Sequence, residues 1–185
     1  MPRIAIEEVD TLDGNDLADL CDAAEIAILD GGGFGWLSPP PRDVMERYWK
    51  GVLLVPERRL FIGRLDDRIG GSAQLVLPPR NNEAQARIAT ITTNFVATWA
   101  RGHGMARSLT LACEKAARRH KIRFINLDVR ETQNAAIQLY ESLGYERWGT
   151  NPNYAVVNGR SITGYYYTKR VGRGGGKDKD ENEAA

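Results

Sequence analysis

The sequence is poor in the residues that build disulfide frameworks and zinc sites, with two cysteines and two histidines among 185 residues. Cys21 and Cys113 fall on the apolar stripes of expected helices, which favours reduced, buried thiols over a disulfide. His103 and His120 do not stand with these cysteines at any zinc-ligand spacing. We therefore expect neither a disulfide nor a metal site.

The chain also lacks a long apolar run and an excess of charge of one sign. No stretch of about 18 apolar residues could span a bilayer, and the segment after Met1 has no signal-peptide core. The 25 Lys and Arg residues nearly balance the 24 Asp and Glu residues, so no basic field favours nucleic acid or an anionic membrane. We expect a soluble, cytoplasmic protein that binds neither. The number of subunits stays open, with a homodimer among the alternatives.

The length and composition fit one ordinary domain. A chain of 185 residues with 42% hydrophobic content has enough apolar material for a single core. We expect this domain over residues 1–170. We expect a disordered polar tail over residues 171–185, because residues 172–185 are rich in Gly, Lys, Asp and Glu and have no apolar anchor.

Hydrophobic periodicity predicts alternating strands and helices, and so an α/β protein. Turn signals at Asp66-Asp67-Arg68 and Asn158-Gly159 predict two hairpins. The expected strands are 3–9, 59–65, 69–77, 87–96, 124–129, 155–157 and 162–169, and the expected helices are 15–29, 43–52, a helix directly after residue 104 and another from residue 134.

A glycine-rich turn at residues 101–106 joins the strand at 87–96 to the next helix. Such a turn leaves backbone N–H groups unpaired at the positive end of the helix dipole, which favours an anion. Gly102 and Gly104 can adopt positive φ and leave the backbone bare, while Arg101 and Arg107 add positive charge. The third glycine of a dinucleotide site and the Gly-Lys-Ser/Thr of a P-loop are both absent. The turn favours a pyrophosphate, with an ordinary strand-to-helix turn as the alternative.

A second pattern follows this turn and makes the combination specific. The matching residues are Phe95-Val96, Arg101-x-x-Gly104-x-Ala106 and Asn134-x-x-Ile137-x-Leu139-Tyr140-x-x-Leu143-Gly144-Tyr145. Together they closely resemble the GNAT superfamily of acyl-CoA-dependent N-acyltransferases. The resemblance covers residues 88–148, and residues 31–49 are similar to bacterial tabtoxin-resistance-type acetyltransferases.

The resemblance implies a GNAT-like single domain with a mixed, splayed β-sheet and helices on both faces. It implies an N-acetyltransferase that moves an acetyl group from acetyl-CoA directly to a primary amine. We expect a small-molecule acceptor, with a protein or peptide amine as the alternative. The backbone N–H of Val96 would then hold the oxyanion of the tetrahedral intermediate. Asn134 would contact the cofactor arm or cap its helix. The implied cofactor-binding residues are Phe95, Val96, Arg101, Gly102, His103, Gly104, Met105, Ala106, Arg107, Asn134 and Tyr140.

The resemblance also makes Tyr140 the candidate general acid for the departing thiolate. A phenol with a pKa near 10 is a weaker acid than a thiol near 8.5, so the transfer costs about 2 kcal/mol in water. Burial raises the pKa of the thiol and so lowers the free-energy cost of the proton transfer. The alternative is that Tyr140 only packs, in one helix stripe with Ile137 and Leu143.

Many resembling enzymes carry a carboxylate on the strand before the glycine turn, and residues 90–94 of this chain carry none. The nearest carboxylates in sequence are Glu83 and Asp128, for which solvation or an ion pair is the ordinary interpretation. The general base is therefore unassigned. A catalytically silent CoA-binding or sensor domain is the alternative function.

Residues 31–41 combine glycines, two aromatic residues and a proline run, a composition that does not support regular structure. We expect a mobile lip in which Phe34 and Trp36 contact the acceptor. The alternative is a plain loop whose two aromatic side chains plug the core.

Overall fold

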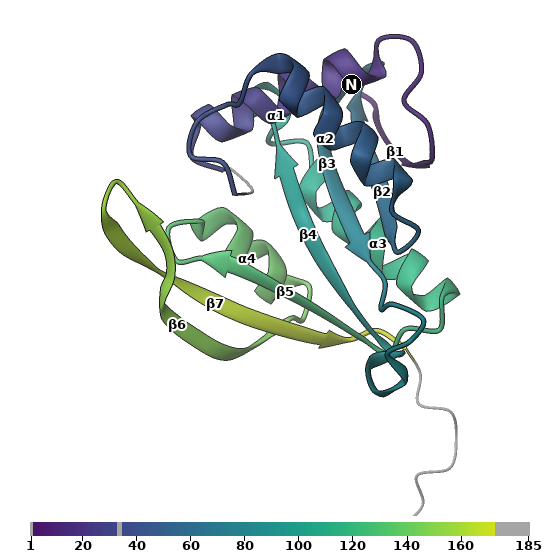
Figure 1. The fold of residues 1–185 in the computed structure, drawn as a ribbon, viewed down its shortest axis with the longest axis vertical. Helices are drawn as coiled ribbons and strands as arrows, with labels where there is room; N and C mark the ends of the chain where they lie inside the picture. The colour runs from purple at the N-terminus through teal and green to yellow at the C-terminus, as the bar shows by residue number, and fades with distance from the viewer. Residues whose placement is uncertain (1, 33–34, 173–185) are drawn as a thin grey trace, which may run out of the picture.

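The computed structural model of the protein describes residues 2–32 and 35–172. The expected substrate contact of Phe34 and the expected disorder beyond residue 172 lie outside these residues. Figure 1 shows the path of the chain. Its elements are β1 (Ile4–Val9), α1 (Asp16–Leu29), α2 (Arg42–Leu54), β2 (Arg58–Leu65), β3 (Arg68–Val76), η1 (Glu83–Gln85), β4 (Ile88–Val96), η2 (Thr98–Ala100), α3 (Met105–Arg119), β5 (Phe124–Arg130), α4 (Asn134–Ser142), β6 (Glu146–Val157) and β7 (Arg160–Arg170).

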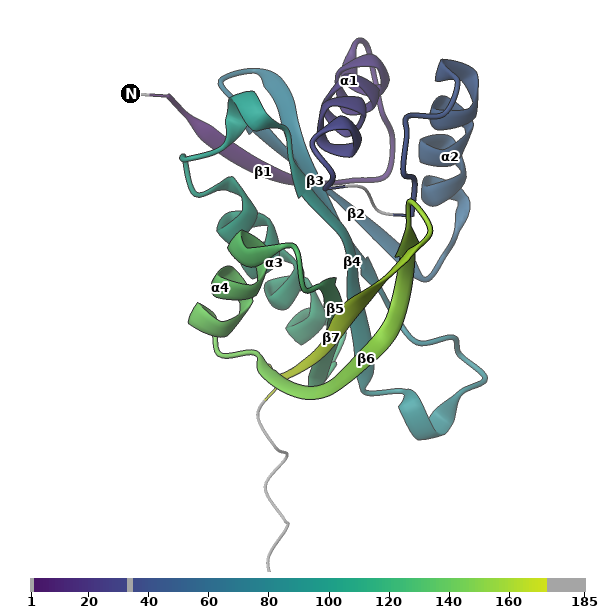
Figure 2. The same cartoon turned by 90° about the vertical axis from the view of Figure 1, so that its left-hand side faces the viewer.

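The strands of the described residues form one mixed sheet in the order β1-β2-β3-β4-β5-β7-β6. β4 and β5 run parallel, and the other neighbouring pairs run antiparallel. Figure 2 shows α1 and α2 on one face of the sheet and α3 and α4 on the other. This arrangement confirms the expected fold class. In the described part of the chain, no helix combines the length and the apolar character needed to cross a membrane.

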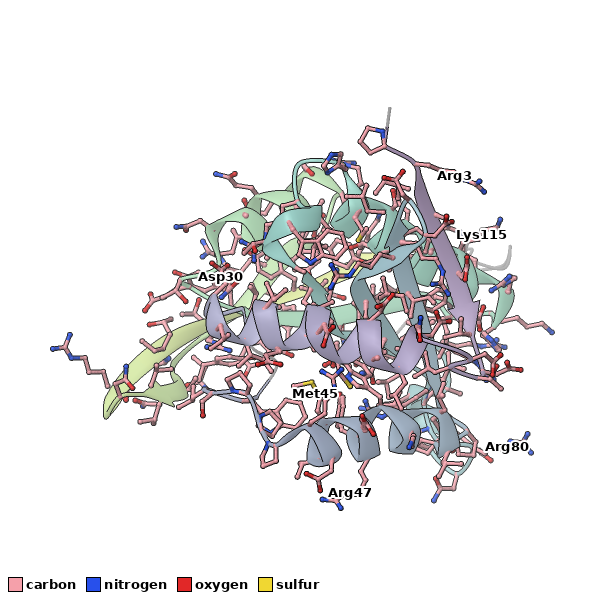
Figure 3. The ribbon with its side chains drawn as sticks, turned by 90° about the horizontal axis from the view of Figure 1, so that it is seen from above. Arg3, Asp30, Met45, Arg47, Arg80 and Lys115 are labelled. Atoms are coloured by element: carbon pink, nitrogen blue, oxygen red, sulfur yellow. The ribbon has the colours of Figure 1, made fainter. Side chains whose placement is uncertain are left out.

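Each face of the sheet has its own apolar core. On one face, Leu20 of α1 packs with Met45 and Trp49 of α2, and Figure 3 shows Met45 between the two helices. On the other face, Leu109 of α3 packs with Ile125 of β5. Burial of one such side chain contributes about 1.5–3 kcal/mol. The apolar stripes of the helices, more than their intrinsic propensities, therefore hold them on the sheet.

β4 and β5 separate soon after they meet, which is the expected splay. Their pairing covers only Ile88 to Thr90 against Phe124 to Asn126. β5 pairs with β7 along its whole length, so it stays with the β6–β7 hairpin while β4 stays with β3. Figure 1 shows the two strands diverging from their shared end. The remaining edge of β4, from Ile91 to Val96, therefore has no strand beside it in the described structure.

β4 changes the faces of its side chains at Thr93. This residue has a φ of 53°, and the register with β3 shifts opposite it, between Ser72 and Gln74. Ile91 lies in the core under α3, whereas Phe95 lies in the core under α1 and α2. In a regular strand both side chains would share one face. The bulge at Thr93 thus turns Asn94 toward α3 and α4.

β6 begins earlier than the sequence predicts, at Glu146 and not near Ala155. It is the outermost strand of the sheet, and most of its residues are exposed or half-buried. Register shifts near Gly149 and between Asn151 and Ala155 interrupt its alternation. A bulged strand without a buried face lacks the apolar period by which strands are recognised.

Candidate active site

The glycine-rich turn forms an open anion site at the start of α3. Gly102 and Gly104 have φ of 80° and 79°, and a Cβ added to either would meet no atom within 4 Å. Gly104 is the N-cap of α3 and no side chain caps the helix. The first N–H groups of α3 therefore face open space at the positive end of the helix dipole. This geometry suits a pyrophosphate.

The charged side chains beside the turn are engaged with protein groups. Arg101 forms an ion pair with Asp30 at 2.7 Å and donates from Nε to the Val96 carbonyl at 3.1 Å. Figure 3 shows Asp30 at the end of α1. Arg107 donates to Ser142 Oγ at 2.7 Å. A phosphate contact by either arginine stays a prediction, as does one by the exposed His103.

Met105 anchors the start of α3 to the sheet. Its side chain is 1% exposed, so its backbone is the part that faces the anion site. A Cβ added to Gly63 would lie 2.8 Å from Met105 Cγ and Sδ. A Cβ at Gly71 would lie 2.6 Å from the carbonyl oxygen of Phe95. Glycines in β2 and β3 therefore make the room that brings Met105 and the end of β4 against the sheet.

The backbone of Val96 faces the open edge of β4. Ala97 donates its N–H to the Gly70 carbonyl of β3 at 2.8 Å, and backbone groups of successive strand residues point to opposite sides. The N–H and carbonyl of Val96 therefore point away from β3. Arg101 donates a hydrogen bond to the Val96 carbonyl. The Val96 N–H faces the space where β4 and β5 diverge. Phe95, in contrast, is buried against Trp49 on the other face.

Tyr140 of α4 is 6% exposed and lines this space. Its hydroxyl accepts a hydrogen bond of 3.3 Å from Asn94 Nδ2, and its ring packs edge-on against Tyr145 with centroids 5.7 Å apart. Burial raises the pKa of Tyr140 to about 12, although the hydrogen bond from Asn94 opposes this rise. The phenol is therefore protonated at any ordinary pH.

A cavity of about 500 Å³ opens where β4 and β5 separate. One carboxylate, Asp128 of β5, is present among the described residues that line it. The hydroxyl of Tyr154 on β6 donates a short hydrogen bond to Asp128 Oδ2. Burial, followed by this hydrogen bond, raises the pKa of Tyr154. The lining also includes Thr92, Asn94, Arg130, Gln133, Tyr140, Val156 and the loop residues Gly32, Gly35 and Leu37.

The loop after α1 lies at this cavity. Gln133, just before α4, donates from Nε2 to the Gly31 carbonyl at 2.9 Å, which links the loop to the far wall. Trp36 is half-buried and packs edge-on against Tyr48 of α2 at 5.1 Å. The described loop residues that line the cavity are Gly32, Gly35 and Leu37. A direct contact between Trp36 and an acceptor stays a prediction.

Asn134 occupies the first position of α4 and is exposed. Gln133 is the N-cap, and no side chain makes a cap hydrogen bond there. The expected capping role of Asn134 is thus not seen. A contact between Asn134 and the cofactor arm stays a prediction.

Neither cysteine is placed or activated to act as a nucleophile. Cys21 and Cys113 are both buried in helices, and neither lines the cavity. Burial raises the pKa of Cys21 to about 11 and raises that of Cys113 further. Both thiols are therefore protonated and inert at neutral pH.

Comparison with known proteins gives a consistent result. A model of the acetyltransferase (GNAT) family matches residues 23–145. An uncharacterised N-acetyltransferase of the hisH-hisA intergenic region of Azospirillum brasilense is 65% identical over 133 residues, which are 72% of this chain and 79% of that protein. The N-acetyltransferase from Staphylococcus aureus Mu50 has a TM-score of 0.76 at 16% identity, over 91% of this chain and 99% of that one. The protein yncA from Salmonella typhimurium, solved with its cofactor acetyl-CoA, has a TM-score of 0.71 at 17% identity, over 98% and 96% of the two chains. These solved structures share the fold described above.

Proposed function

Because this chain belongs to the GNAT acetyltransferase family and is an acetyl-CoA-dependent N-acetyltransferase, we propose that it acetylates the primary amine of a small molecule. The observation that carries this proposal is the cavity between β4 and β5. Its volume of about 500 Å³ lies within the range of sites that enclose small ligands. The loop after α1 and the β6–β7 hairpin both contribute to its wall, which favours a compact acceptor over an extended peptide.

Asp128 is the group that would hold the acceptor. An alkyl ammonium has a pKa of about 10.4, so the acceptor arrives charged at neutral pH. The carboxylate of Asp128 lines the cavity and keeps one oxygen, Oδ1, outside its hydrogen bond with Tyr154. An ion pair with this carboxylate would orient the nitrogen. β5 would thereby supply the carboxylate that β4 lacks.

The chain's own groups suit a direct transfer. Acetyl-CoA, when bound, would supply the acetyl group as a thioester. The bound ammonium would first release a proton to water, and the neutral amine would then attack the carbonyl carbon. The N–H of Val96 would donate to the oxygen on which negative charge develops. As the carbon–sulfur bond breaks, Tyr140 would give its proton to the sulfur. The proton that the acetylated nitrogen sheds would pass through solvent and restore the phenol. The absence of an activated cysteine at the cavity supports direct transfer to the amine without an acetyl-enzyme.

Thiol release from acetyl-CoA over a panel of small amines tests this function. We expect turnover with one chemical group of amines, and acetylated amine in a 1:1 ratio with thiol. Tight binding of acetyl-CoA without turnover, across amines of all types, would favour the silent sensor domain. Turnover on peptide amino termini alone would overturn the small-molecule acceptor and keep the acetyltransferase.

Replacing Asp128→Asn is expected to raise KM for the amine by about tenfold or more, with a smaller change in kcat. A hydrogen bond to a charged group contributes about 1.5–3 kcal/mol, and the variant removes the negative charge while keeping the shape. Steady-state kinetics at saturating acetyl-CoA measure the effect. The matched control is Asp43→Asn on the outer surface of α2, where Asp43 pairs with Arg47. An unchanged KM in Asp128→Asn would exclude Asp128 from acceptor binding.

The pH profile of kcat should rise with the fraction of bound amine that is neutral and should show no fall up to about pH 10. Tyr140 acts in its protonated form, and burial raises its pKa to about 12. The acid is thus fully present throughout the range below that pKa and is lost only as the pH rises through it. A fall of kcat centred near pH 8.5, as a thiol acid would give, would contradict this role. Measurement of kcat from pH 6 to about pH 10 decides the point.

A further inference from the structure

We infer that Asn94 is a positioning residue that directs the hydroxyl proton of Tyr140 toward the cavity. The inference deepens the proposed function and rests on it, since it concerns how the proton reaches the departing sulfur. It is carried by two hydrogen bonds that link α3, β4 and α4. They join Thr110 to Asn94 and Asn94 to Tyr140.

The backbone of α3 determines which group donates and which accepts at each of these hydrogen bonds. Thr110 is fully buried, and its hydroxyl donates to the Ala106 carbonyl one turn earlier, at 2.9 Å. A hydroxyl has one proton, so Thr110 Oγ1 is left as an acceptor. Asn94 must therefore present its NH₂ group to Thr110, at 3.0 Å. The orientation of the Asn94 amide follows from this bond.

The second N–H of the same group then reaches Tyr140. Asn94 Nδ2 lies 3.3 Å from the Tyr140 hydroxyl oxygen, and an amide NH₂ donates only. Tyr140 therefore accepts at this bond, and its own proton is free to point elsewhere. Since Tyr140 lines the cavity, the proton is directed there. With the amide reversed, Tyr140 would donate to Asn94 and its proton would be occupied.

Two further observations indicate that this orientation is enforced. The amide oxygen of Asn94 is buried without a hydrogen-bond partner in the described residues, a state that an unconstrained amide would avoid. The bulge at Thr93, with its φ of 53°, turns Asn94 toward α3 and α4. A non-glycine residue in this conformation carries strain. The strained backbone at Thr93 thus places the Asn94 side chain against Tyr140.

The donated N–H also bears on the acidity of Tyr140. Burial raises the pKa of the phenol, which weakens it as an acid, and the Asn94 hydrogen bond opposes that rise because it stabilises the phenolate. A buried tyrosine without this donor would release its proton less readily. Asn94 therefore acts twice, on the direction of the proton and on the strength of the acid.

The test is a double-mutant cycle on kcat. Asn94→Leu keeps the number of side-chain atoms and removes both donors. We expect it to lower kcat about tenfold, the size of one buried hydrogen bond, with the dissociation constant of acetyl-CoA changed less than twofold. In a Tyr140→Phe background the same substitution should leave kcat unchanged, because the group through which it acts is gone.

Thr110 provides the graded control. Thr110→Val keeps the shape and removes the acceptor that orients the amide, so kcat should fall by a few fold, while Thr110→Ser should keep the parental value. Thermal unfolding of each variant reports whether the fold is intact. If Asn94→Leu lowered kcat by the same factor in the parent and in Tyr140→Phe, this inference alone would be overturned. A parent that releases no thiol with any amine would overturn it together with the proposed function.

Discussion

Replacing Tyr140→Phe is expected to lower kcat about 100-fold, in line with the loss of one general acid, while KM for acetyl-CoA changes little. The ring keeps its place in the core under α4, so packing is retained. The hydroxyl is the only part removed, and the hydrogen bond from Asn94 leaves its proton free for the sulfur. Steady-state thiol release at saturating amine measures the change.

Tyr145→Phe is the matched control for this result. Tyr145 packs edge-on against Tyr140 and is 3% exposed, but it does not line the cavity. Its substitution should leave kcat near the parental value. Parental kcat in Tyr140→Phe would show that solvent or another group protonates the thiolate. Tyr140 would then have only the packing role that its place beside Ile137 and Leu143 offers.

Replacing Gly104→Val should weaken acetyl-CoA binding by well over tenfold. A Cβ at this position would meet no protein atom within 4 Å, so the added side chain would project into the space proposed for the pyrophosphate. The φ of 79° adds strain of about 1–2 kcal/mol for a residue other than glycine. Calorimetric titration with acetyl-CoA measures the loss of affinity.

Gly14→Val separates the strain of a positive φ from the steric exclusion of the pyrophosphate. Gly14 has a φ of 56° and open space around an added Cβ, and it lies between β1 and α1, away from the turn. The substitution should cost similar stability without changing the affinity for acetyl-CoA. Equal affinity in Gly104→Val and the parent would mean that the glycine-rich turn only reverses the chain.

The sequence predicts the parts of this site that depend on neighbours along the chain. The turn at Gly102 and Gly104, the helix after it and the stripe of Tyr140 each follow from local spacing. The shared end of β4 and β5, and the splay beyond it, follow from the resemblance. The turn and the helix stripe could be predicted because glycines that allow a positive φ and an apolar helix period are visible within a few residues of sequence. The splay has no such local signal.

The remaining parts depend on contacts between distant segments. Asp128 accepts its hydrogen bond at the cavity from Tyr154, which lies on a bulged edge strand whose start the apolar period does not reveal. Arg101 forms its ion pair with Asp30, which precedes it by about 70 residues in the chain. Neither pairing has a local signal.

The contact between Asn94 and Tyr140 could not be predicted from the sequence for a different reason. Its face of β4 is reversed by a bulge at Thr93, a threonine in a conformation that favours glycine. Read as a regular strand, residues 88–96 place Asn94 on the face opposite Ile91, under α1 and α2, and away from Tyr140. A threonine gives no sign that the alternation changes at this point.

The most direct test of the account is a structure of the protein with a non-reactive acetyl-CoA analogue and an amine that it acetylates. We expect the pyrophosphate at the N–H groups of residues 102–106 and the thioester oxygen within hydrogen-bond distance of the Val96 N–H. The sulfur should lie beside the Tyr140 hydroxyl, and the acceptor nitrogen beside Asp128. An acceptor bound outside the cavity between β4 and β5, or a sulfur out of reach of Tyr140, would contradict the account.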